Sequence, residues 1–397
     1  MTRPARSDAA HSHGSATPAL ALLAATLFIF LSAEMLPVGL LPELSVAFSI
    51  SPGTAGLLLS CYAIIAAIAG IPITNLTASW PRHRLLMIAL LTLATSQLVF
   101  ALSTTFWLAL ASRAVAALLH TTVWAIVPVI ASKLGGPASG KATSYVFLGS
   151  ALGLVLGTPA VAGLGQAFGW RFVAGLIAVL AAGLAVLLRV ILPTLKPSQQ
   201  HHRRGGVAHR LTLLLPRGLN SRVLLVSSAT AVLVLGHYCA YTYFALIFAD
   251  KGGSQSFWPL TLVIFGGFGL IGVLGAGRWI DRYRTPVSLG VLLLLPVALL
   301  AILLLPLAGL YPATAMWGAA IAAVPLVMQS AVIRASADTA DESSAIYVVA
   351  FQIGISGGSW LGGLLLSSAG INGTLVMAIL LTGIVGLALV PFRRVFR

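Results

Sequence analysis

Apolar stretches of about 20 residues recur along almost the whole 397-residue chain, separated by short polar segments. A helix needs roughly 20 apolar residues to cross the hydrocarbon core of a bilayer. Only 8% of the residues are charged, too few to cover the surface of a soluble domain of this size. The sequence therefore predicts an all-helical integral membrane protein with twelve spans, at residues 17–42, 53–79, 84–103, 105–131, 142–166, 171–192, 221–248, 256–277, 286–307, 310–333, 343–368 and 373–391.

Lys and Arg residues collect in alternate loops of this twelve-span arrangement. If both termini lie on one side, 20 of the 23 Lys and Arg residues share that side, whereas Arg171 and Lys251 lie opposite and Arg113 lies within a span. Loops rich in Lys and Arg stay in the cytoplasm. We therefore expect a multi-pass protein of the inner (cytoplasmic) membrane with both termini cytoplasmic. The net charge of +15 reports orientation in the lipid bilayer and not a nucleic-acid partner.

Polar segments divide the chain into two parts of six spans each. Residues 1–16 predict a disordered cytoplasmic tail, and 193–220 predict a cytoplasmic linker between six-helix bundles at 17–192 and 221–397. One alternative is a signal peptide, because Arg3 and Arg6 precede an apolar run that reaches Ser32 and Ala33. Its cleavage would leave eleven spans and disturb the alternation of charge.

The two halves repeat one another in sequence. Arg82 and Arg84 follow the second span, and Asp281 and Arg282 follow the eighth about 200 residues later. Glycines four residues apart occur in the fifth and eleventh spans, 205 residues apart, and allow another helix to approach closely; they are Gly149, Gly153 and Gly157, then Gly354, Gly358 and Gly362. We expect the glycines of the fifth span to pack between the halves and Pro159 to bend the helix there. Two similar halves imply a substrate site between them at mid-depth and alternating access by rocking.

A carboxylate inside the first span, Glu34, is the strongest functional signal, since a charge in hydrocarbon is costly and usually marks a transport route. Arg113 in the fourth span is predicted at the same depth, roughly 12 Å below the outer surface. Burial favours the neutral acid and Arg113 favours the carboxylate, so movement between environments would load and release a proton. The alternatives are a static ion pair, or an interfacial Glu34 if the span ends at Pro37.

Several polar side chains inside the spans are candidate substrate contacts: His120, Trp124, His237, Tyr241 and Gln352. His120 and Trp124 lie on the same helical face as Arg113, and His237 and Tyr241 are four residues apart on another face. Neutral packing roles are the alternative, and we expect Tyr238 and Tyr243 to point elsewhere and Trp317 to be a core residue. The free cysteines, Cys61 and Cys239, suggest packing; no spacing predicts a metal site or a cofactor.

Ordered motifs along the chain resemble a known family. They are the segments Glu34 to Pro42, Arg113 with His120 to Trp124, Gly149 to Pro159 followed by Gly169 to Arg171, Gly236 to Tyr243, and Phe351 to Gly354. Together they resemble the major facilitator superfamily, specifically the drug:proton antiporter branch with bacterial sugar exporters and chloramphenicol-resistance exporters. The resemblance implies that spans 1, 4, 7 and 10 line a central cavity, and that Arg82, Arg84, Asp281 and Arg282 form conformational latches. The first latch motif has Pro81 in place of its usual acid, and Gln352 stands where close exporters more often have Asn.

The predicted function is proton-coupled export of a small organic solute, a sugar or a small amphiphilic drug, by alternating access. The predicted partners are that solute, protons and lipid, with the chain acting as a monomer. An uncoupled facilitator or a transporter-like sensor is the alternative. An enzyme is not expected, because no nucleophile or cluster of acids and histidines is apparent.

Overall fold

The computed structural model describes residues 13–77, 79–135, 139–192, 220–280, 282–336 and 340–393. Throughout these ranges the chain forms helices and turns, without a strand, which confirms the predicted all-helical class. The helices are α1 (His13–Gly39), α2 (Leu41–Ala47), α3 (Pro52–Leu76), α4 (Arg82–Leu102), α5 (Phe106–Gly135), α6 (Ser139–Leu152), η2 (Gly153–Gly157), α7 (Thr158–Phe168), α8 (Trp170–Ile191), α10 (Ser221–Tyr241), α11 (Phe244–Asp250), η4 (Gln255–Phe257), α12 (Trp258–Ile280), α13 (Arg284–Leu304), α14 (Leu307–Ala335) and α15 (Ala340–Ala388). Most of the predicted tail, the linker apart from Asn220, and Asp281 fall outside the described residues.

Eleven helical segments of the described chain are long and apolar enough to cross a membrane. The last of them, Ser343–Ala388, has 46 residues, about twice the length that a bilayer requires. Within it Gly370 has φ 68° and ψ −169°, a conformation that breaks the helix and that glycine adopts readily. This segment is therefore two spans joined at Gly370, and the total of twelve agrees with the sequence prediction.

Three predicted spans are interrupted. The first stops at Gly39 and resumes as the short helix α2, and the seventh breaks at Thr242 and Tyr243 before α11. The fifth contains the π-helical turn η2 two residues before Pro159. Proline cannot donate a backbone hydrogen bond, and a π-bulge is one way in which a helix absorbs that loss. The interruptions of the first and seventh spans occupy matching places in the two halves.

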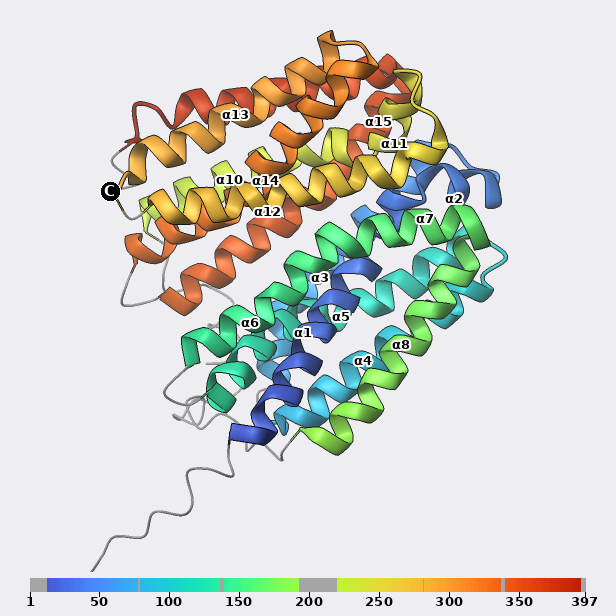
Figure 1. Ribbon diagram of the computed structural model, residues 1–397, viewed down its shortest axis with the longest axis vertical. Helices are drawn as coiled ribbons and strands as arrows, with labels where there is room; N and C mark the ends of the chain where they lie inside the picture. The colour runs from blue at the N-terminus through green and yellow to red at the C-terminus, as the bar shows by residue number, and fades with distance from the viewer. Residues whose placement is uncertain are drawn as a thin grey trace, which may run out of the picture.

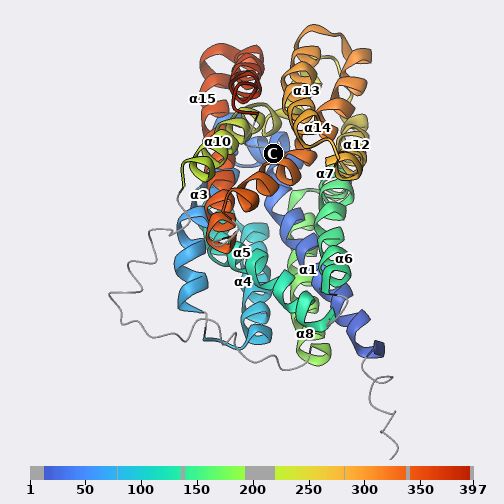
Figure 2. The ribbon, with the colours of Figure 1, turned by 90° about the vertical axis from the view of Figure 1, so that its left-hand side faces the viewer.

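The helices form two bundles, α1 to α8 and α10 to α15, which lie one above the other in both Figure 1 and Figure 2. The glycine series pack within the bundles and not between them, so our expectation for the fifth span was wrong. The series of the fifth span faces α1, and the series of the eleventh faces α10: Gly149 meets Ala24, Gly153 meets Phe28, Gly157 meets Ser32, Gly354 meets Ala231, Gly358 meets Leu235 and Gly362 meets Cys239. Each of these α1 residues stands 207 residues before its α10 counterpart, so the two halves repeat the same helix pairing.

The bundles contact each other toward one end of the molecule, which we call the closed end. There Gly53 on α3 lies so near Gly363 on α15 that an added Cβ would stand 2.7 Å from the Gly363 carbonyl oxygen. The Ser359 hydroxyl donates to the Gly56 carbonyl at 2.8 Å, and the Trp258 indole donates to the Gly39 carbonyl at 3.0 Å. Each of these contacts joins one bundle to the other.

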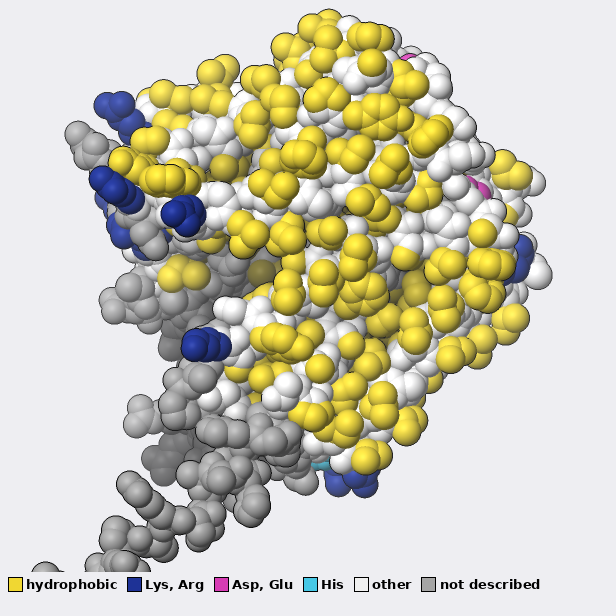
Figure 3. All heavy atoms as spheres, viewed as in Figure 1, with side chains coloured by type: hydrophobic (Ala, Val, Ile, Leu, Met, Phe, Trp, Pro, Cys, Tyr) yellow, Lys and Arg dark blue, Asp and Glu magenta, His cyan; other side chains and the backbone are white. Residues whose placement is uncertain are grey.

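The opposite end, which we call the basic end, carries most of the Lys and Arg residues. They stand where spans begin or end: Arg82, Arg84, Lys133, Lys141, Arg189, Arg222, Arg278, Arg284 and Arg334. Figure 3 shows Lys and Arg side chains mainly toward the left-hand side of the view, where the two bundles of Figure 1 diverge. Apolar side chains cover most of the visible face. An apolar belt with charge at its rim is the surface that a bilayer requires.

Candidate functional site

Glu34 lies inside the protein, near the closed end of α1. Its side chain is 3% exposed, and its Oε2 atom stands 3.6 Å from Nε2 of His120, whereas its Oε1 atom has no hydrogen-bond partner. Because α1 ends at Gly39, five residues after Glu34, the acid is about 8 Å from the end of this helix. Pro37 lies within the helix, so the span does not end there, and the low exposure of Glu34 shows that it points neither into lipid nor into bulk solvent.

Arg113 contacts the backbone that carries Glu34. Its guanidinium donates from Nη1 to the Ala33 carbonyl at 2.5 Å and from Nη2 to the Glu34 carbonyl at 2.9 Å. The Ala33 carbonyl has no helical partner, since the residue four positions later is Pro37, which lacks an N–H. Arg113 therefore supplies the hydrogen bond that the proline removes, so it contacts α1 through directed hydrogen bonds as well as through its charge.

His120 connects the carboxyl group to α3. Its Nδ1 atom shares a 2.8 Å hydrogen bond with the Tyr62 hydroxyl, and its Nε2 atom faces Glu34. The Trp124 ring lies 6.0 Å from the imidazole, and the Trp124 Nε1 atom has no partner. Which of Nδ1 and the Tyr62 hydroxyl donates depends on the tautomer of the imidazole. Tyr62 was not identified from the sequence, although a phenol in an apolar span implies a partner.

Two residues of the second half approach Glu34 across the interface between the bundles. Gln352 on α15 interacts with its carboxyl group, and Tyr238 on α10 lies within electrostatic range of it. We expected Tyr238 to point elsewhere, and that expectation was wrong. The residue lies beside α15, where its Cβ is close to Gly358, so the glycine packing turns its side chain toward the interface.

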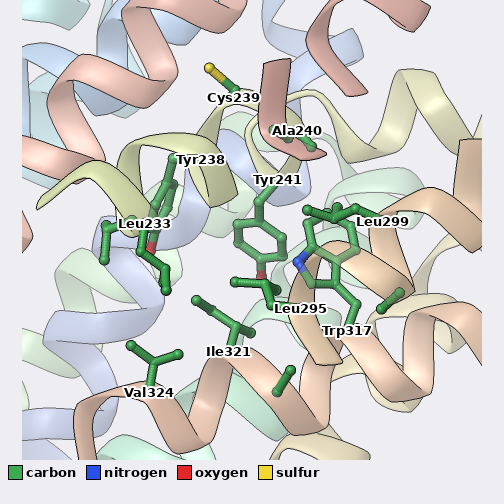
Figure 4. Close-up of a cluster of buried hydrophobic side chains, with 14 of the residues drawn as sticks. Leu233, Tyr238, Cys239, Ala240, Tyr241, Leu295, Leu299, Trp317, Ile321 and Val324 are labelled. Atoms are coloured by element: carbon green, nitrogen blue, oxygen red, sulfur yellow. The ribbon is translucent and has the colours of Figure 1, made fainter. Parts of the chain in front are cut away.

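His237 and Tyr241 belong to an aromatic cluster inside the second bundle, and Tyr238 links this cluster to the interface, since its ring lies 4.7 Å from that of His237 and 5.8 Å from that of Tyr241. Their rings stack at 4.9 Å, and the Trp317 indole donates to His237 Nδ1 at 3.0 Å. Figure 4 shows Tyr241 and Trp317 side by side among aliphatic side chains. His237 is 3% exposed and Tyr241 1% exposed, so the cluster is part of the core. Of the candidate substrate contacts, the structure thus brings His120 and Gln352 near Glu34, places Trp124 beside His120, and places the other two in this cluster.

The candidate latch residues lie at the basic end. Arg82 is partly buried at the start of α4, Arg84 is exposed, and Arg282 stacks on the Tyr283 ring at 5.2 Å. Asp281 lies outside the described residues. The geometry of the basic end therefore leaves the latches as a hypothesis derived from the resemblance.

The site is a buried carboxyl group between two bundles, held by a guanidinium on its backbone and linked to an imidazole and a phenol. Groups of this kind inside a membrane mark proton or solute routes. The chain matches the model of the Major Facilitator Superfamily over residues 22–359, and it belongs to that family. It is a multi-pass membrane transporter of small solutes and not an enzyme.

Relatives of known name lie in the efflux branch of the family. The chain is 35% identical over 388 residues to a chloramphenicol efflux pump of Mycobacterium tuberculosis, with 93% of this chain and 90% of the pump covered. It is 29% identical over 360 residues to a probable sugar efflux transporter of Mannheimia succiniciproducens, with 88% of this chain and 87% of the transporter covered.

Solved structures share the fold at low identity. A bacterial homologue of the human lysosomal transporter Spinster, in an inward-facing and unoccupied conformation, matches with a TM-score of 0.75 at 14% identity, covering 96% of this chain and 98% of the other. The xylose transporter XylE from E. coli matches with a TM-score of 0.73 at 14% identity, covering 96% of this chain and 98% of XylE.

Proposed function

We propose that this protein is a proton-coupled exporter of a small organic solute, with Glu34 as the coupling acid. The observation that carries the proposal is a buried carboxyl group at the contact between the two bundles, with neighbours from both halves. Rocking of the bundles separates Glu34 from Gln352 and Tyr238, so its surroundings change with the transport state. A change of surroundings is what allows an acid to load a proton in one state and release it in another.

Orientation follows from the charge distribution. If the basic end faces the cytoplasm, as the positive-inside rule favours, the contacts at the closed end seal the outer side and the structure is open inward. The solute would then enter from the cytoplasm while a proton leaves Glu34. Outward opening would bring the acid toward the outer solution, where it takes up the next proton.

The solute contacts proposed in the first half are His120 and Trp124, with Gln352 opposite. His120 and Gln352 lie near the carboxyl group of Glu34, and Trp124 lies beside His120. The Oε1 atom of Glu34 has no hydrogen-bond partner, so proton and solute compete for one place. His237 and Tyr241 lie in the aromatic cluster, from which they support the residues that line the solute pathway. The names of the relatives favour an amphenicol-type drug or a sugar as the solute.

Transport into inverted membrane vesicles tests the proposal. With an imposed pH gradient, vesicles that contain the protein should accumulate chloramphenicol or a pentose, and collapse of the gradient should abolish accumulation. Glu34→Gln should lose the gradient-driven accumulation but retain binding. Asp250→Asn is the matched control, since it neutralises an exposed carboxylate at the end of α11. If Glu34→Gln accumulates solute as the wild type does, the coupling role is wrong and an uncoupled facilitator is the better description.

A further inference from the structure

The first half of the chain has very few negative charges. No Asp or Glu stands between Glu43 and Asp250, although this stretch holds more than half of the Lys and Arg residues. The two acids that the structure describes in this half, Glu34 and Glu43, lie toward the closed end. The basic residues at the other end of the first bundle therefore have no acid among the described residues of their own half to neutralise them.

The second half differs at the matching places. Its sequence contains acids after the eighth span and before the eleventh, namely Asp281, Asp338, Asp341 and Glu342. Arg284 and Arg334, which stand at the ends of spans there, each have a partner within the protein. The loop between the fourth and fifth spans, by contrast, has Lys133 and Lys141 and no acid. The first half thus lacks the anions that the second half carries in its own sequence.

Three basic side chains of the first bundle lie where α4 begins and α8 ends. The two helices lie side by side and antiparallel (Figure 1), and Arg171 at the start of α8 donates to the Ser103 carbonyl just after α4 at 3.1 Å. At the other end of this pair, Arg84 and Arg189 are exposed and lie within electrostatic range of the partly exposed His83. Figure 3 shows Lys, Arg and His side chains together at the lower rim, where both helices end in Figure 1. Positive groups held this close repel one another, so an anion between them is stabilising.

The helix faces next to these cations are apolar and exposed. Ile88 and Leu91 follow Arg84 by four and seven residues, so the three side chains share one face of α4. On α8, the exposed Val186 precedes Arg189 by three residues and lies on its face. Leu91 stands roughly 10 Å below Arg84 along the helix, which is acyl-chain depth when the arginine is at headgroup level. A lipid uses both the cations and the apolar faces, whereas a free phosphate ion uses only the cations.

We propose that this corner of the first bundle binds an anionic phospholipid of the cytoplasmic leaflet, with Arg84, Arg189 and His83 around its phosphate. The acyl chains lie against the exposed apolar faces of α4 and α8. Basic clusters beside membrane spans attract anionic lipids of this leaflet, and the positive-inside rule places the basic end on that side. The lipid supplies the negative charge that the first half lacks there. This lipid site is distinct from the buried site around Glu34 and does not depend on the solute or on proton coupling.

Native mass spectrometry of the purified full-length protein, mixed with equal amounts of phosphatidylglycerol and phosphatidylcholine, tests the proposal. The two lipids carry the same acyl chains, but only phosphatidylglycerol has a net negative charge. The wild type should retain phosphatidylglycerol with a preference of at least about tenfold, or 1.4 kcal/mol. Arg84→Gln combined with Arg189→Gln should remove most of this preference. Arg278→Gln combined with Arg393→Gln is the matched control, because it removes two exposed arginines of the second bundle and should leave the preference intact.

Four results would overturn the proposal. They are equal retention of the two lipids by the wild type, an unchanged preference in the Arg84 and Arg189 variant, an equal loss in the control variant, and displacement of phosphatidylglycerol by excess inorganic phosphate. The last result would show a site for free anions and not for a lipid. Arg84→Lys combined with Arg189→Lys keeps both charges and should keep the preference, so it separates loss of charge from damage to the fold. The wild-type comparison of the two lipids needs no variant and stands even if one fails to fold.

Discussion

Replacement of Arg113 by lysine tests whether this residue acts by geometry or only by charge. Lysine keeps the positive charge but has a single nitrogen atom, so it cannot serve two carbonyls of α1 and one of α3 in the fork that the guanidinium provides. Two of the three bonds should be lost. Hydrogen bonds to charged groups contribute roughly 1.5–3 kcal/mol each, so Arg113→Lys should lower the free energy of unfolding by about 3–6 kcal/mol.

A double-mutant cycle with Pro37→Ala makes this test specific. Alanine at position 37 restores a backbone N–H for the Ala33 carbonyl, so Arg113 is then needed less. Loss of Arg113 should cost about 1–3 kcal/mol less in the Pro37→Ala background, the penalty for one unsatisfied buried carbonyl. Unfolding of the purified protein in detergent, followed by tryptophan fluorescence, measures all four variants. Strictly additive effects, or an Arg113→Lys protein as stable as the wild type, would refute the reasoning.

The remaining predictions concern packing and the closed end. Gly149→Ala should destabilise the protein by about 1–3 kcal/mol because its Cβ would overlap the Ala24 backbone, whereas Gly183→Ala, which has open space around it, should be neutral or slightly stabilising; equal melting temperatures would contradict this. Ser359→Ala removes a bond between the bundles worth about 0.5–1.5 kcal/mol, so spin-label distances across the closed end should show up to about tenfold more of the outward-open state, and an unchanged distribution would count against the gate. Burial raises the pKa of the Glu43 carboxyl on α2, so the closed conformation binds this proton more tightly than the opened one. The closed conformation should therefore become less stable as the external pH rises. Glu43→Gln should flatten this pH dependence, and an undiminished pH response in the variant would exclude Glu43 as its cause.

Much of the fold could be predicted from local sequence. Span length and apolar content depend on the bilayer thickness, so the twelve spans follow from composition alone. The interruptions could not be located in this way. Neither Thr242 nor Tyr243 is a helix-breaking residue, and the Tyr243 hydroxyl donates to the Ser359 carbonyl on α15, a contact that no local pattern predicts.

The candidate site was predicted less completely. Glu34 and Arg113 are conspicuous because charges are rare in spans, and the structure places them in contact. The contact runs through the backbone of α1 and not between the two charged groups, however, and no local pattern marked Tyr62 or Tyr238 as a neighbour. Side-chain partners 58 or about 200 residues away depend on helix rotation, which apolar periodicity defines poorly when every face of a helix is apolar.

The amino-acid sequence by itself determined the membrane class, the number of spans, the two-fold repeat and the presence of one acid inside the spans of the first half. Each of these follows from the cost of exposing backbone and charge to hydrocarbon, which acts on every residue separately. Only the tertiary structure decided that the glycines join spans within a bundle, that Arg113 repairs the backbone at Pro37, and that Glu34 keeps one oxygen atom free. Those features depend on which helix faces which, and in a membrane that choice is made by close packing and by hydrogen bonds between distant residues.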